Sequence, residues 1–177
     1  LETVIPGYYL CGAIAAMVGQ YNPSQPFTNF PMVGFVRPLG SSDAFTENQM
    51  ATAAAGGVYW VIQDVTGAPL VSRHQLTTDL TSIKTRELSV TKAVDYVAKQ
   101  LRQSVRRFIG RNNITQGLLD QISLVIAGNL KSLAGNIVNT ASLDSLVVDT
   151  SAPDKIAVQV TVVPFYPANK ITITIVV

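Results

Sequence analysis

Cysteine and histidine are almost absent from this 177-residue chain, which has Cys11 and His74 and no other residue of either type. One cysteine cannot form an intrachain disulfide, and one cysteine with one histidine cannot supply the four ligands of a structural zinc site. The longest apolar run, residues 11–19, is far shorter than the ~20 residues that span a bilayer. The sequence therefore predicts no metal, no cofactor and no membrane insertion.

Charged residues are also scarce, at 14% of the chain, whereas hydrophobic residues make up 47%. Soluble domains usually carry about 25% charged residues, so we expect a partner to cover part of this surface. The 13 basic and 11 acidic residues give a net charge of +2, too small to indicate nucleic acid as a partner. The length fits a single domain over residues 1–177. Because the chain begins on Leu1 rather than Met, we expect a fragment of a longer protein.

Short elements and an irregular loop are predicted in the first part of the chain. Residues 8–20 are typical of a helix rich in small residues, and Asn22 and Pro23 end it. Four prolines between residues 23 and 38 exclude regular structure there. We expect an ordered loop whose aromatic anchors are Phe27, Phe30 and Phe35.

A helix and a hairpin are predicted next. Asp43 or Thr46 can cap a short helix that ends near Gly56, the residue expected to take the left-handed conformation. Residues 57–64 and 70–78 have the composition of strands and are separated by a Gly-Ala-Pro turn. The simplest arrangement of the two is an antiparallel hairpin.

From Ser89 onward the apolar period becomes 3.6 residues, which predicts two long amphipathic helices. The apolar stripe of the first consists of Val90, Val94, Val97, Leu101, Val105 and Phe108. Gly110 breaks this helix, and Thr115 can cap the second. The second stripe consists of Leu118, Leu119, Ile122, Val125, Ile126, Leu130 and Leu133. The two stripes predict a helical hairpin.

The chain ends in β-type sequence, over residues 145–150, 154–166 and 171–177. The last segment alternates apolar and polar residues as a half-buried strand does, and no later residue covers its edge. Its residues are Ile171, Thr172, Ile173, Thr174, Ile175, Val176 and Val177. The fold class predicted is α/β (α+β): a small, mostly antiparallel or mixed sheet packed on two long helices, with a C-terminal β-strand arm over residues 164–177.

Ser72 and His74 are the only candidates for nucleophilic catalysis. They lie two residues apart in an expected strand, so both side chains share one face, and Asp64 or Asp79 could orient the histidine. No sharp strand-to-helix elbow surrounds Ser72, and no oxyanion-hole loop is recognisable. The pattern favours an ordinary hairpin, and we assign no catalytic residue.

The strongest polar feature is a basic face on the first long helix. Its residues are Lys92, Lys99, Arg102, Arg106 and Arg107, with Arg111 just beyond. Such a face is solvated or binds an acidic protein, and the lack of aromatic residues between the cations disfavours nucleic acid.

Three patterns follow one another along the chain: Pro6, Gly7 and Gly12 at the start of a helix, a proline-rich loop from Asn22 to Pro31, and residues 86–92 at the entry to an arginine-rich helix. Together they resemble the C-terminal half of the contractile tail sheath proteins of phages and related injection particles. Residues 70–82 are more polar than the usual approach to that helix, and the large N-terminal part of a sheath protein is missing.

The resemblance implies a non-enzymatic structural subunit that self-assembles around a tail tube and contracts to drive genome or effector delivery. The implied partners are further copies of the chain, in a helical homo-polymer of stacked rings, and the tail tube protein. The basic face would contact the tube, and residues 171–177 would add a strand to a neighbour's sheet. The implied location is the virion tail, assembled in the host cytoplasm. The alternatives are a hydrolase domain that uses Ser72 and His74, and a monomeric binding module that uses the basic helix.

Overall fold

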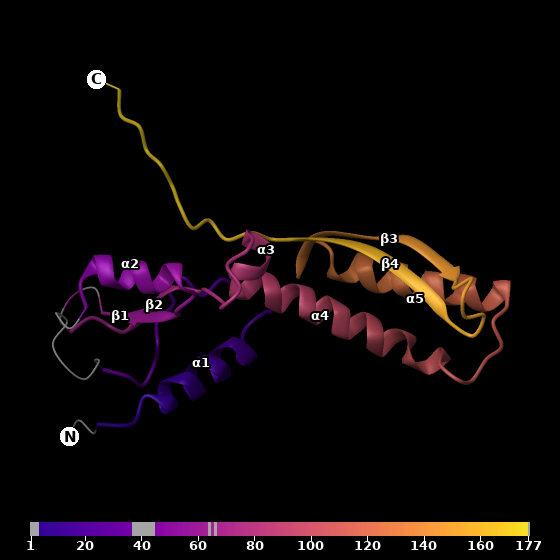
Figure 1. Ribbon diagram of the computed structural model, residues 1–177, viewed down its shortest axis with the longest axis horizontal. Coiled ribbons are helices and arrows are strands. Elements are labelled where there is room, and N and C mark those ends of the chain that lie inside the picture. The colour runs from indigo at the N-terminus through magenta and orange to yellow at the C-terminus, as the bar shows by residue number, and fades with distance from the viewer. Residues whose placement is uncertain (1–3, 37–44, 64, 66, 177) are drawn as a thin grey trace. The chain divides into compact units, whose positions relative to one another are not determined.

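The computed structural model describes residues 4–36, 45–63, 65 and 67–176. These residues form five α-helices, a short 3₁₀-helix and two separate two-stranded antiparallel sheets, which is a mixed α+β fold (Figure 1). The chain divides into two compact units. Unit 1 comprises residues 1–91 and 166–177, and unit 2 comprises residues 92–165. The predicted fold class is confirmed, with the sheet divided into two hairpins.

Helix α1 (Tyr8–Gln20) has the bounds that the sequence predicts, and it ends at Tyr21, whose backbone is extended. Met17 is its buried residue and belongs to the core of unit 1 with Phe27, Met32 and Leu70. The helix therefore contributes one apolar stripe to unit 1, and the rest of its surface is largely exposed.

The proline-rich loop is ordered where it is described, and it lies along a strand edge. Phe27 is fully buried, and its ring meets the Phe30 ring edge to face at 5.6 Å. The Ser72 amide donates to the Phe30 carbonyl at 2.9 Å, and the Met32 amide donates to the Leu70 carbonyl at 2.7 Å. These bonds satisfy backbone groups that a two-stranded hairpin would leave open.

Helix α2 (Glu47–Ala55) begins with a capping box, in which Thr46 and Gln49 satisfy each other's backbone amides. Asp43, the other predicted cap, lies outside the described residues. The left-handed residue after the helix is Gly57 (φ +81°), whereas Gly56 has φ −93°. A Cβ at Gly57 would lie 3.0 Å from the Thr77 carbonyl oxygen, so the position requires glycine on two grounds.

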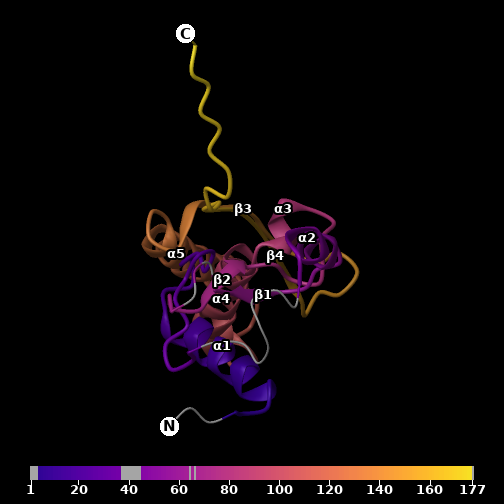
Figure 2. The same ribbon diagram turned by 90° about the vertical axis from the view of Figure 1, so that its left-hand side faces the viewer.

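Strands β1 (Trp60–Ile62) and β2 (Val71–His74) pair antiparallel, which confirms the predicted hairpin. Both views place this hairpin between α1 and α2 (Figures 1 and 2). Helix α3 (Ile83–Arg86) is a single turn that precedes α4 (Leu88–Val105).

In unit 2, α4 continues into the 3₁₀-helix η2 (Arg106–Phe108), and its packing departs from the predicted stripe at one position. Ala93 and Val97 are buried, whereas Val94 is 39% exposed. Leu101 and Val105 are half-buried against the same core. Val90 is buried as well, so the predicted stripe is confirmed except at Val94. The prediction missed Ala93, because alanine does not stand out in a stripe of large apolar residues.

Helix α5 (Gln116–Leu133) agrees more closely with its prediction. The Thr115 hydroxyl accepts a hydrogen bond from the Leu118 amide at 3.2 Å, as expected of an N-cap. The buried residues of α5 are Leu118, Ile122, Ile126, Leu130 and Leu133. With Ala93 and Val97 of α4 they form the core of unit 2.

Strands β3 (Val138–Val148) and β4 (Ile156–Pro164) form a long antiparallel hairpin that packs along α5 (Figure 1). The register shifts twice, between Val138 and Thr140 and between Leu143 and Ser145. The inward side chains, such as Val160 and Val162, pack against the core of unit 2. Within the described part of the chain no third strand joins this sheet, so both strands have an outer edge with backbone groups open to a partner.

Candidate functional site

The structure brings three of the predicted basic residues onto one open helix face. Lys99, Arg102 and Arg106 are exposed, on the side of the helix opposite the buried Ala93 and Val97. Within the described ranges, none of these three cations forms an ion pair. Their charge is therefore available to an acidic partner.

The other two predicted residues lie at the margins of this face. Lys92 is half-buried, and burial lowers the pKa of its ammonium group, because loss of water disfavours the charged form. The Arg107 guanidinium carbon lies 4.9 Å from the centroid of the Phe108 ring, in cation–π geometry.

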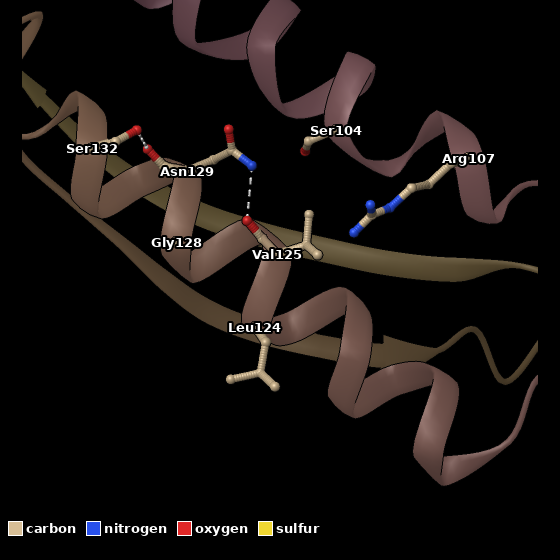
Figure 3. A pocket seen from close by; sticks show the side chains of 7 residues that line it. All are labelled: Ser104, Arg107, Leu124, Val125, Gly128, Asn129 and Ser132. Atoms are coloured by element: carbon tan, nitrogen blue, oxygen red, sulfur yellow. Dashed lines mark hydrogen bonds between the residues drawn. The ribbon is translucent and has the colours of Figure 1, made fainter.

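Arg107 also lines an open groove between the end of α4 and α5, with a volume of about 390 Å³. Its guanidinium points toward α5 (Figure 3). It is the one charged residue in the lining, which consists of Ser104, Arg107, Leu124, Val125, Gly128, Asn129 and Ser132. Asn129 and Ser132 already donate to carbonyls of their own helix. The groove can contact a side chain of a partner, but it does not enclose a small molecule.

The C-terminal segment, residues 170–176, forms no strand with the rest of the described chain. Ile171, Ile173 and Ile175 are 80–81% exposed, and Val176 is 91% exposed. Figure 2 draws this yellow end of the chain as an extended trace without helix or strand. Burying one such side chain would contribute about 1.5–3 kcal/mol. The alternation that predicts a strand thus has no second strand to pair with among the described residues.

The root of this segment is held by a side-chain cluster that sequence reasoning missed. The Asn169 side-chain amide donates to the Glu87 carboxyl oxygen Oε1 at 2.9 Å, and His74 Nε2 lies 3.0 Å from the same oxygen. The Arg86 Nε donates to it at 3.3 Å. The Glu87 side chain is fully buried. No periodic signal could have found a contact between residues 82 positions apart.

Ser72 and His74 do not form a catalytic pair in this geometry. Ser72 is fully buried, and His74 Nε2 bonds to Glu87 instead. Burial raises the pKa of the Tyr59 hydroxyl, because loss of water disfavours its charged form. Asp79 accepts from the Thr81 amide and hydroxyl, which lowers the pKa of its carboxyl group, and Asp64 lies outside the described residues. A serine without accessible surface cannot attack a substrate.

Within the described ranges, no group of three His, Cys, Asp or Glu side chains could hold a metal ion. None of the described helices is both long enough and apolar enough to cross a membrane.

No protein-family model and no curated protein matches the sequence. Solved structures do match the fold. A chain in the cryo-EM structure of the anti-feeding prophage baseplate superposes with a TM-score of 0.78 and 14% identity, over 97% of this chain and 50% of that one.

Two further matches come from helical sheaths in the contracted state. The anti-feeding prophage sheath gives a TM-score of 0.73 at 16% identity, and the PVC sheath of an extracellular contractile injection system gives 0.70 at 14%. Each match covers 94% of this chain and 49% of the other. The chain therefore has the fold of about half of a contractile sheath subunit, which confirms at the level of fold the resemblance that the sequence indicates.

Proposed function

We propose that this chain is part of a structural subunit of a contractile sheath, which self-assembles around a tail tube and contracts to drive delivery of a genome or an effector. The observation that carries the proposal is the fold, which two contracted sheath structures share over nearly the whole chain. The exposed C-terminal segment and the basic face of α4 give the proposal its two contact surfaces.

In this proposal, residues 171–177 of one subunit add a strand to the β3–β4 sheet of a neighbour. β3 and β4 have 11 and 9 residues, long enough to pair with the whole segment, whereas β1 and β2 have 3 and 4. Strand addition supplies main-chain hydrogen bonds and buries alternate side chains. The three exposed isoleucines would then become half-buried, which favours assembly over the free subunit.

The basic face faces the tail tube in the same proposal. Lys99, Arg102 and Arg106 have no counter-ion within the described chain. Single exposed ion pairs contribute little, but many repeated around a helical sheath add up and can exchange when the sheath contracts. The proposed setting is the tail of a phage or of a phage-like injection particle, assembled in the cytoplasm of the producing cell. No cofactor and no catalytic step enters this mechanism.

Sedimentation velocity of the full-length protein that contains this chain tests the proposal. We expect assemblies that grow with protein concentration and appear as tubes in the electron microscope. A protein that stays monomeric at every concentration, with or without a tail tube, would favour the monomeric binding module instead.

A further inference from the structure

One carboxyl oxygen of Glu87 links the rest of unit 1 to the C-terminal segment. The residues around it, His74, Arg86 and Asn169, are called the Glu87 cluster below. Oε1 lies within hydrogen-bond distance of His74, Arg86 and Asn169, whereas Oε2 is buried and has no partner among the described residues. A buried carboxyl group is costly unless donors offset the lost water. The groups around Oε1 offset part of this cost, and Asn169 is the one that the C-terminal segment supplies.

Glu87 itself is held firmly by the backbone around it. The Thr91 amide donates to the Glu87 carbonyl at 3.1 Å, which places Glu87 at the start of α4. The neighbouring Leu88 amide donates to the Gln75 carbonyl at 2.9 Å, and the Thr77 amide donates to the Arg86 carbonyl at 2.8 Å. The carboxyl group is thus a fixed point on unit 1, not a side chain that follows the segment.

The contact with Asn169 also marks a change along the segment. Pro167 is half-buried, and the Asn169 amide donates to its carbonyl at 3.0 Å in a tight turn. From Lys170 onward every described side chain is exposed, and no backbone hydrogen bond joins residues 170–176 to another described residue. Within the described chain, Asn169 is the last residue of the segment that a hydrogen bond holds to unit 1.

We propose that His74, Glu87 and Asn169 form an anchor that fixes the root of the C-terminal segment to its own subunit. Residues 166–169 remain bound to unit 1, and only the residues after Asn169 pair with a neighbouring copy of the chain. This role rests on the proposed function, because it supposes that the segment is donated. The anchor fixes the position at which the donated strand begins. A force applied to that strand is then borne by unit 1 and is not transmitted to β4.

Trypsin cleavage after Lys170 measures the anchor directly in the 177-residue chain. A protease needs several residues on either side of the bond in an extended, released conformation. Removal of Ile171–Val177 is followed by mass spectrometry, and each rate is divided by that of a synthetic peptide of residues 165–177 with the same substitution. We expect Asn169→Ala to speed this cleavage about tenfold, because it removes a hydrogen bond to a buried carboxyl group. Asn169→Asp should speed it at least as much, because it sets one carboxyl group against another.

Two controls make the result specific. Thr174→Ala lies beyond the anchor and should leave the rate after Lys170 unchanged. Cleavage after Lys155, in the turn between β3 and β4, should have the same rate in all variants. Wild-type rates in both Asn169 variants, or equal acceleration at Lys155 and Lys170, would overturn the anchor. The assay needs no assembly, so a chain that never polymerises would refute the proposed function and leave this result standing.

Discussion

Replacing Leu130 by alanine tests the packing of unit 2 most sharply, because three leucines of this unit, two on α5 and one on α4, lie in three different environments. Leu130 is 1% exposed in the core, and Leu124 on the same helix is 74% exposed. Leu101 on α4 is half-buried against the same core. The same chemical change at each position therefore isolates the effect of burial.

The expected loss of stability follows from the carbon atoms removed. A leucine-to-alanine change deletes three carbons, at about 0.8 kcal/mol for each buried one, and the cavity left behind raises the total for a closed site to about 3–5 kcal/mol. For Leu101, which solvent already reaches, we expect about 1–2 kcal/mol. For Leu124 we expect a change within about 0.5 kcal/mol.

Urea unfolding followed by circular dichroism measures these differences, with the wild-type chain and the three variants treated alike. A change in midpoint at constant slope reports a change in the free energy of unfolding. Two resolved transitions would show that units 1 and 2 unfold separately, and only the transition of unit 2 should then move.

The prediction depends on the order of the three losses of unfolding free energy, which should fall from Leu130 to Leu101 to Leu124. Equal losses at Leu130 and Leu124, or a larger loss at Leu124, would mean that α5 presents a different face to the core. An unchanged midpoint for Leu130→Ala would refute the packing of α5 against β3 and β4.

Four other changes test separate parts of the structure. Ile173→Pro removes an amide hydrogen and should prevent polymerisation while circular dichroism of the subunit stays unchanged; a loss of the fold would show that the strand is internal. Reversing Arg102 and Arg106 to Glu should leave the free energy of unfolding nearly unchanged but weaken co-sedimentation with tail tubes, more so at low salt. If the variant still co-sediments with tail tubes, this helix face does not bind the tube and contacts only solvent. Ser72→Ala should keep assembly intact, and a hydrolytic activity that disappears in this variant would revive the enzyme hypothesis. Gly57→Ala should cost about 1–3 kcal/mol in urea unfolding, because the position combines a positive φ with a close backbone neighbour; no change would mean that the turn relaxes.

Elements that depend on local signals were predicted well. The bounds of α1 follow from the Pro-Gly before it and the Asn-Pro after it, and the start of α5 follows from Thr115. The β1–β2 hairpin follows from the turn at Gly67, which has φ +87°. Capping and turn chemistry act within a few residues, so they can be read without knowing the fold.

Features that depend on distant contacts could not be predicted. The division into two sheets depends on tertiary pairing, which alternation within one strand does not encode. The choice of Gly57 over Gly56 depends on Thr77 and Thr78, twenty residues later. The contact between Glu87 and Asn169 joins the middle of the chain to its end. Four residues of the predicted basic face are exposed: Lys99, Arg102, Arg106 and Arg107. The direction of the Arg107 side chain toward α5 depends on how the two helices pack, which the sequence pattern does not encode.

The measurement that tests the central claim most directly is electron microscopy of the full-length protein beside a variant that lacks residues 171–177. Circular dichroism on the same samples reports whether each is folded. We expect tubes from the full-length protein, and a folded variant that forms none. Tubes built without these residues would contradict strand donation, and a variant that unfolds would show that the segment belongs to the subunit's own core.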